Sequence, residues 1–197
     1  MADFSSLTIS EVVISPKGAK YAQVTSNGTR PTYSHAGYVR CPFGPSTFDR
    51  DETAPRQTLE FRTDPTMFEF FTSLDEWAKT YIANNSETLF KKKMSREQVE
   101  ERYVSCLKQH PSHDPLLKTK INMPNSATPA RIWDQTGVRT SLPTHWKNVE
   151  VRPKIQISNL WIMSNQVGLV LQVMDLMVRE EQHDCPFATD AMETDAF

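Results

Sequence analysis

Basic and aromatic side chains are interleaved along several short segments of the chain. These residue types bind phosphate groups and stack on nucleobases, respectively. In residues 149–157, Arg152 and Lys154 alternate with apolar residues, a period-2 pattern that predicts a strand with one buried and one cationic face. We predict nucleic-acid contacts for residues of this kind, namely Lys20, Tyr33, Arg40, Phe61, Arg62, Lys118, Lys120, Arg131, Trp133, Arg152 and Lys154.

The alternative is that the aromatic rings belong to the core and that the cations contact only water. Taken singly, a tyrosine or phenylalanine is more commonly a core residue than a binding residue. The combination of both residue types on the same segments is what favours binding. The run from Lys91 to Lys93 follows an expected helix, and we interpret it as a solvated connection.

A metal site or a catalytic site has less support. Cys106, His110 and His113 have a spacing that would allow metal contact, with Asp114 beside them, but prolines interrupt the segment and no second cysteine pair completes a zinc site. The chain has no phosphate-binding glycine loop and no nucleophile elbow. We therefore expect no metal, no cofactor and no enzymatic activity. A small hydrolase that uses Cys106 and His110 remains the alternative.

Charge divides the chain into two parts. Residues 180–197 contain six acidic residues, no lysine or arginine, and a terminal Phe197. The remaining residues, 1–179, hold all 22 basic residues and 18 of the 24 acidic ones, so their net charge is +4 against −6 in the last segment. We predict a folded domain over 1–179 and a flexible acidic tail over 180–197.

The element pattern predicts a mainly β fold with inserted helices, an α+β arrangement that resembles an OB-fold-like antiparallel barrel. Another small α+β sheet is the alternative. The Asp64-Pro65 pair predicts a helix start, and Ser95 with Gln98 forms a capping box for a second helix. The expected helical insertion covers about 65–110. Strands are expected at residues 7–14, 19–25, 32–40, 59–62, 116–123, 130–133, 149–163 and 167–178.

The last two strands should form a long antiparallel hairpin around which the rest of the sheet is organised. Ser164, Asn165 and Gln166 read as its turn, and a break in the alternation at Ser158 and Asn159 predicts a β-bulge. Residues 167–178 are apolar at nearly every position, which predicts burial on both faces. Because this exceeds what a small barrel needs to bury, we expect self-association as a homodimer through this strand or through exchange of tails.

Cysteine usage and hydropathy bear on the compartment. Cys41, Cys106 and Cys185 are odd in number and widely spaced, which disfavours a disulfide framework and suits a reducing, intracellular environment. No apolar run approaches the roughly 20 residues of a membrane span, and the N-terminal residues lack the pattern of a signal peptide. We therefore expect no membrane partner.

A basic OB-fold-like body followed by an acidic tail that ends in phenylalanine resembles the replicative single-stranded DNA-binding proteins of bacteria, short-tailed phages and large DNA viruses of eukaryotes. The phage-like viral branch is most similar in layout, and the string RPKIQISNLWIM is similar to the last-strand region of the viral members. The resemblance implies binding of single-stranded DNA without strong sequence preference, in viral DNA replication, recombination or repair. It also implies a location in the host nucleus or at a cytoplasmic replication site.

In these families the tail recruits a polymerase, helicase or primase and shields the DNA groove when DNA is absent. The resemblance gives that role to Asp190, Glu193, Asp195 and Phe197. The acids of this tail are spaced rather than contiguous. Two other interpretations remain: a structural or assembly protein that binds a partner protein through the tail, and a general module for RNA or single-stranded DNA.

Overall fold

Two long strands near the end of the chain form the centre of the structure, a computed structural model that describes residues 3–179. They are β10 (Val149–Ile162) and β11 (Val167–Arg179), joined by a short turn. Their pairing is antiparallel, with register shifts after Lys154 and after Ile157. The predicted hairpin and the predicted bulge near Ser158 are both confirmed.

The other elements pack around this hairpin. The strands before the helices are β1 (Leu7–Ile9), β2 (Val13–Ile14), β3 (Lys20–Ser26), β4 (Thr32–Ser34), β5 (Val39–Cys41) and β6 (Arg56–Arg62). The helices are α1 (Pro65–Asn84), α2 (Ser86–Phe90) and α3 (Arg96–Glu100), and the remaining strands are β7 (Leu107–His110), β8 (His113–Asn122) and β9 (Arg131–Trp133).

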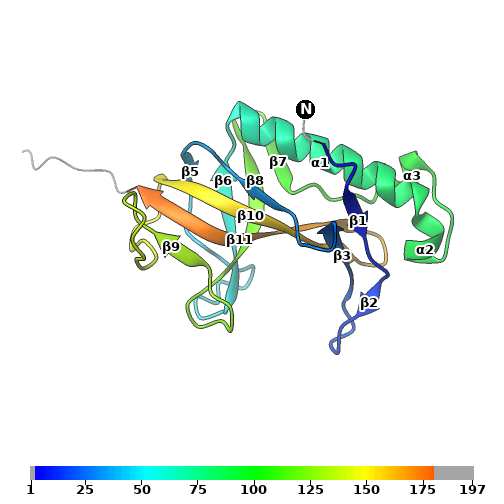
Figure 1. The fold of residues 1–197 in the computed structure, drawn as a ribbon, viewed down its shortest axis with the longest axis horizontal. Coiled ribbons are helices and arrows are strands. Elements are labelled where there is room, and N and C mark those ends of the chain that lie inside the picture. The colour runs from blue at the N-terminus through cyan, green and yellow to red at the C-terminus, as the bar shows by residue number, and fades with distance from the viewer. Residues whose placement is uncertain (1–2, 180–197) are drawn as a thin grey trace, which may run out of the picture.

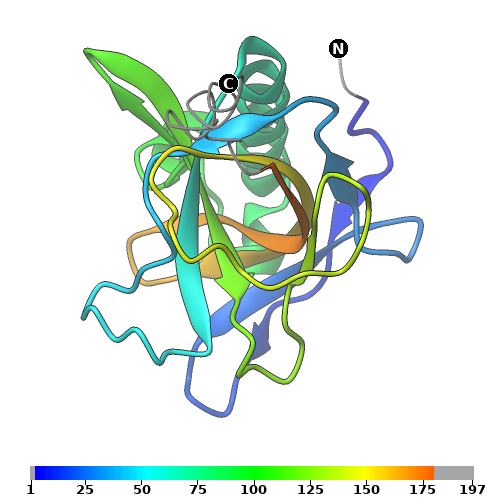
Figure 2. The same ribbon diagram turned by 90° about the vertical axis from the view of Figure 1, so that its left-hand side faces the viewer.

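The strands form one curled sheet in the order β1-β3-β10-β11-β8-β6. β4 and β5 also pair with β10, and β9 pairs with β11. All pairs are antiparallel except β11 with β8 and β11 with β9. Seen end-on, the strands curl toward a barrel-like shape, and the connection from β9 to β10 crosses the end that faces the viewer (Figure 2). The fold-class prediction, mainly β with inserted helices in an OB-fold-like arrangement, is confirmed.

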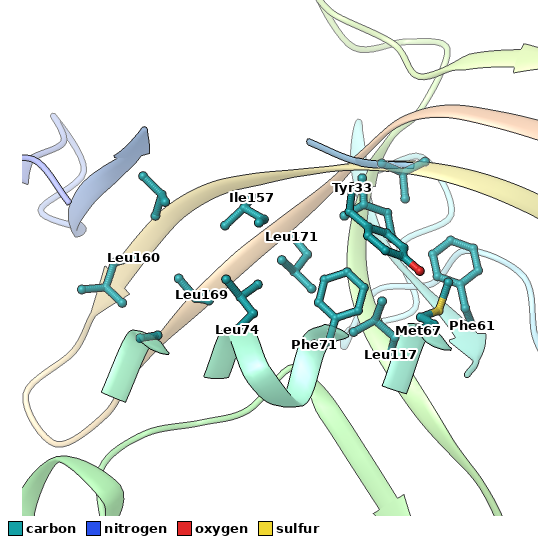
Figure 3. Packing of buried hydrophobic residues seen from close by; sticks show 14 of the residues in the cluster. Tyr33, Phe61, Met67, Phe71, Leu74, Leu117, Ile157, Leu160, Leu169 and Leu171 are labelled. Atoms are coloured by element: carbon teal, nitrogen blue, oxygen red, sulfur yellow. The ribbon is translucent and has the colours of Figure 1, made fainter. Parts of the chain in front are cut away.

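Helix α1 covers one face of the curled sheet (Figure 1). The Asp64 carboxylate caps it by accepting a hydrogen bond from the Met67 backbone N–H at 2.7 Å, and Pro65 occupies its first turn. Its apolar side, including Phe71 and Leu74, packs on strand residues from β6, β8, β10 and β11 (Figure 3). No helix within residues 3–179 is both long and apolar enough to cross a membrane.

Two of the predicted strands are interrupted. Residues 7–14 form β1 and β2 instead of one strand. Ile9 pairs with Val24 and Val13 pairs with Tyr21, so this segment has one residue more than the stretch of β3 opposite it, and the pairing is interrupted. Residues 32–40 form β4 and β5, which pair with β10 on either side of Pro153. A proline has no N–H to donate to a ladder, so the chain leaves the sheet at this point.

The second predicted helix is shorter than expected. The Ser95–Gln98 capping box is present, but α3 ends at Glu100. The backbone N–H of Val104 donates to the Val167 carbonyl at 2.8 Å, and the N–H of Val167 donates to the Arg102 carbonyl at 3.0 Å. These bonds to the start of β11 pull the segment out of the helix, so that Leu107 already begins β7.

The apolar strand at residues 167–178 is used within the chain. β11 lies between β10 and β8, and Leu169, Leu171 and Val173 are each at most 3% exposed. These core-facing side chains are therefore buried within the chain itself, and self-association as a homodimer stays a prediction.

Candidate nucleic-acid interface

The face of the sheet opposite α1 carries a row of polar side chains across five strands. Residues in register on neighbouring strands point to the same face. The pairing puts in one row Thr58 of β6, Lys120 of β8, Gln172 of β11, Gln156 of β10 and Thr32 of β4. Cations two or four positions away on these strands, and Arg131 on β9, belong to the same face. We call this surface the basic face and define it by Arg56, Lys118, Lys120, Arg131, Arg152 and Lys154.

The centre of the basic face is a cluster of three cations on β6 and β8. Lys120 Nζ donates to Thr58 Oγ1 at 2.8 Å, and Arg56 Nη2 donates to Gln172 Oε1 at 3.0 Å. Burial lowers the pKa of Lys120, and the positive charges of Lys118 and Arg56 lower it further. None of the three forms an ion pair with a carboxylate of the described residues. The cluster therefore holds positive charge that an anion would neutralise.

The acidic groups of the same face already have cationic partners. Asp175 accepts hydrogen bonds from Arg131 Nη2 at 2.7 Å and from Trp133 Nε1 at 3.0 Å. Burial raises the pKa of Asp175, but these bonds outweigh it and leave the pKa below its ordinary value. Glu60 forms an ion pair with Lys108. The negative charges are thus compensated, whereas Lys118 and Lys120 are not.

Arg152 and Lys154 extend the basic face along β10, as the alternation of residues 149–157 predicts. Both side chains are exposed, while Val151 before them and Ile155 after them are fully buried. Arg152 Nε donates to the His35 carbonyl at 2.9 Å, which holds the guanidinium against β4.

Two of the predicted binding residues lie in the core instead. Phe61 is 0% exposed and Tyr33 is 9% exposed, and both point toward α1 (Figure 3). The Tyr33 ring lies 4.4 Å from the Phe70 ring and 5.1 Å from the Phe71 ring between centroids. Burial, with a contribution from the charge of Asp64, raises the pKa of Tyr33 to about 12. Neither ring has a free face for a base, so the prediction of stacking on these two residues is corrected.

The remaining predicted residues occupy the margins. Arg62 continues the basic face along β6, opposite Leu116. Arg40 lies at the far end of β10, 3.6 Å from Glu150. Lys20 pairs with Ile162 at the opposite end of β10, about 26 Å from Lys154 at the usual rise of a strand, so it does not belong to the basic face.

Trp133 lies on the basic face, but its ring is partly covered. It is half-buried, and the guanidinium of Arg139 lies 5.1 Å from the ring centroid. Such a cation–π contact occupies one face of the indole. Trp133 therefore offers a nucleobase at most one face.

The structure adds two exposed aromatic residues in a segment whose sequence pattern predicts neither a helix nor a strand. Phe43 and Phe48 are 66% and 107% exposed, and they lie in the connection from β5 to β6. Ser46 between them pairs with Thr58 through two backbone hydrogen bonds of 2.9 and 2.7 Å, which fixes the loop beside the basic face. The only signal in the sequence was the presence of large rings in a segment too rich in proline and glycine to form a core element.

Arg56 and Gln172 were also missed. Alternation along residues 56–62 puts Arg56 on the same face as Thr58 and Arg62, but the strand was expected to begin only at Leu59. Gln172 lies inside an apolar run that was interpreted as buried on both faces.

Of the alternative cysteine site, the structure describes the thiol of Cys106. No group of three His, Cys, Asp or Glu side chains within the described residues is arranged to hold a metal ion. Cys106 Sγ donates to the Leu169 carbonyl at 3.2 Å, and burial raises the pKa of this thiol to about 12. A thiol with such a pKa is protonated near neutral pH and is a weak nucleophile.

The predicted partner-binding residues Asp190, Glu193, Asp195 and Phe197 lie outside the described residues. The structure does describe Arg179, the residue directly before the predicted tail. Arg179 ends β11 opposite Glu150, four residues beyond Asp175 of the basic face.

The chain is similar in structure to phage-encoded single-stranded DNA-binding proteins. One is gp2.5 of bacteriophage T7, with a TM-score of 0.49, 13% sequence identity, and coverage of 86% of this chain and 99% of that chain. Another is the single-stranded DNA-binding protein of bacteriophage Enc34 in complex with single-stranded DNA, with a TM-score of 0.45, 12% identity, and coverage of 91% and 95%. No protein-family model matches the sequence, and no curated protein matches it.

Proposed function

We propose that this protein binds single-stranded DNA through the basic face, without strong sequence preference. The observation that carries the proposal is the cluster of Arg56, Lys118 and Lys120, whose positive charge no carboxylate of the described residues neutralises. Burial lowers the pKa of Lys120, and repulsion from the like charges of Lys118 and Arg56 lowers it further. The negative charge of a phosphate backbone relieves this repulsion, and each neutralised phosphate also releases condensed counterions, which favours binding.

The chemistry of the face fits a nucleic-acid backbone better than an ordered array of bases. Lysine and arginine contacts to phosphates fix the position of a strand but carry no sequence information. The exposed rings of Phe43 and Phe48 beside the face offer stacking surfaces, which every base can use. Binding is therefore expected to depend strongly on salt and weakly on sequence.

Titration of a fluorescently labelled oligo-dT strand with the protein tests this function. We expect saturable binding whose affinity falls with salt, with a slope of about −0.7 in log K against log salt for each phosphate contact. The Lys118→Ala/Lys120→Ala variant should lose affinity. Lys93→Ala is the matched control, because Lys93 is exposed and lies outside the basic face. Absence of binding by the unaltered protein at low salt would overturn the proposal.

We also propose that the acidic tail competes with DNA for the basic face and recruits replication proteins such as a polymerase, helicase or primase. The support is electrostatic and positional. The tail carries −6 against +4 for residues 1–179, and it begins directly after Arg179 at one edge of the basic face. A tethered segment acts at an effective concentration on the order of millimolar, so weak contacts suffice for competition.

Deletion of residues 180–197 tests the competition. The deletion should tighten oligo-dT binding, most at low salt, since exposed charges are screened beyond about 10 Å at 0.1 M salt. Deletion of Phe197 alone should leave DNA affinity nearly unchanged and reduce co-purification with replication proteins, because this residue is apolar. Unchanged DNA affinity after deletion of the whole tail at low salt would reduce the tail to a partner-binding peptide.

A further inference from the structure

A second concentration of positive charge lies at the other end of β10, in a groove of about 1080 Å³. Its walls are the β2–β3 hairpin, the end of α2 with the segment that follows it, and the turn from β10 to β11. These three elements gather at one end of the molecule, away from the end where β11 stops (Figure 1).

The lining of the groove combines cations with apolar surface. The cations are Lys17, Lys20, Lys91, Lys92 and Arg102, and Glu11 is the only acidic residue among the lining residues. The apolar part includes Trp161, Phe90 and Met163. None of the five cations forms an ion pair within residues 3–179. This arrangement fits a ligand that has regularly spaced negative charges and flat apolar groups.

Trp161 is held in a fixed position at this site. It pairs with Gly168 across the hairpin, and a Cβ atom at position 168 would lie 2.9 Å from Trp161 Cζ2 and 2.6 Å from the Val104 carbonyl oxygen. The absence of a side chain at Gly168 therefore lets the indole lie against the strand. The ring is half-buried and lines the groove. It therefore offers a base a stacking surface, and the indole loses little conformational freedom when a base binds.

We propose that this groove binds a second segment of the same single-stranded DNA molecule that occupies the basic face. The inference rests on the proposed function and extends it to a second site. Gln156 of the basic face is five residues from Trp161 on β10, a distance of roughly 17 Å at the usual rise of a strand. About five stacked nucleotides span this distance.

Arg30 lies between the two sites. Its side chain is exposed, and Nη1 donates to Ser158 Oγ at 2.9 Å, midway between Gln156 and Trp161 on β10. No carboxylate of the described residues pairs with Arg30. Cations therefore continue along β10 from Lys154 through Arg30 to the groove.

The acidic tail of the same chain fits the groove less well. It begins after Arg179, which pairs with Glu150 at the far end of the hairpin. Glu150 and Trp161 are eleven residues apart, so the start of the tail lies roughly 36 Å from the groove. DNA that already occupies the neighbouring basic face is much closer.

The test compares two oligo-dT lengths within the range of about 4–16 nucleotides covered by single OB folds. A strand of about 6 nucleotides should fill only the basic face, and one of about 16 should also reach the groove. The Lys17→Glu/Lys92→Glu variant should bind the long strand about tenfold more weakly, with a salt slope shallower by about 0.7 per lost contact, and bind the short strand unchanged.

Lys93→Glu is the matched control. Lys93 is exposed and adjacent to Lys92 but does not line the groove, so its reversal should change neither affinity. Equal losses for the groove variant and the Lys93→Glu control, or no loss in either, would overturn the inference. Failure of the unaltered protein to bind both lengths would instead overturn the proposed function.

Two further measurements separate the occupants. Quenching of tryptophan fluorescence should be greater with the long strand than with the short one, and Trp161→Phe should remove this difference. A synthetic peptide of residues 180–197 should bind equally to the groove variant and the unaltered protein. Selective loss of peptide binding, with both DNA affinities intact, would assign the groove to an acidic peptide and contradict the inference.

Discussion

Strands β6 and β8 present two faces built from alternate residues of the same segments, and the two faces have opposite properties. On the side of α1, Phe61 and Leu117 are 0% exposed. On the other side, Lys118 and Lys120 carry unpaired charge one residue away from buried neighbours. Stability and DNA binding should therefore separate almost completely between adjacent positions.

The largest effect is expected on the core face. Phe61→Ala removes a fully buried ring and should lower the free energy of unfolding by about 3–5 kcal/mol, measured by urea denaturation. Arg62→Ala, at the next position on the other face, should change it by no more than about 0.5 kcal/mol. If Phe61→Ala had normal stability but bound DNA weakly, Phe61 would be a DNA-binding residue and not a core residue.

The second effect belongs to the basic face. Lys118→Ala/Lys120→Ala should weaken oligo-dT binding by about 2–3 kcal/mol, roughly 30- to 150-fold, because two charge-assisted contacts to phosphates are lost. Its free energy of unfolding should stay the same or rise, since repulsion with Arg56 is relieved. An affinity close to that of Lys93→Ala would remove this cluster from the interface.

A smaller effect is expected beside the basic face. Phe43→Ser and Phe48→Ser should each weaken binding by about 1–2 kcal/mol if a base stacks on the ring, with an unchanged salt slope because no charge is lost. Asp49, Asp51 and Glu52 follow Phe48, so Phe43→Ser should have the larger effect. Steeper or shallower salt dependence in either variant would show that stacking is not what the substitution removes.

The alternation of apolar and polar residues predicted those features of the two faces that are determined within one strand or one hairpin. It gave the β10–β11 hairpin, its bulge, and the outward position of Arg152 and Lys154. It gave no way to tell an aromatic ring on the buried face from one on the exposed face when the strand was short. Tyr33 and Phe61 were misplaced for this reason, because their burial depends on where α1 packs.

Contacts between distant segments were the other part that the sequence did not predict. Arg56 and Lys120 come together only through the pairing of β6 with β8. The groove at the other end of β10 likewise brings together the β2–β3 hairpin, the end of α2, Arg102 and the β10–β11 turn. The length of α3 was overestimated for the same reason, since its end is set by hydrogen bonds from residues 102–104 to Val167. The capping box of Ser95 and Gln98 marks where this helix begins but carries no information about that competition.

The smallest expected effect is a pH dependence inside the core face, at Asp75 of α1. Asp75 is 8% exposed and accepts hydrogen bonds from Tyr103 Oη at 2.6 Å and from Ser105 Oγ. Burial raises its pKa above 3.8, and the lowering by the two hydrogen bonds does not cancel this. A carboxyl group whose pKa is raised by folding stabilises the protein fully below its unfolded pKa, and this contribution is lost as pH rises through the folded pKa.

Glu76, the next residue on α1, provides a control of opposite sign. The hydrogen bond from Lys79 is the largest cause that lowers its pKa below 4.5, so its contribution to stability is present at higher pH and lost as pH falls. We expect urea denaturation between about pH 3 and 7 to show that the free energy of unfolding of Asp75→Asn increases relative to that of the unaltered protein as pH rises. The free energy of unfolding of Glu76→Gln should decrease relative to that of the unaltered protein over the same interval. If both variants shifted in the same direction, burial against the sheet would not be what controls the proton on Asp75, and the core face would be more hydrated than its packing implies.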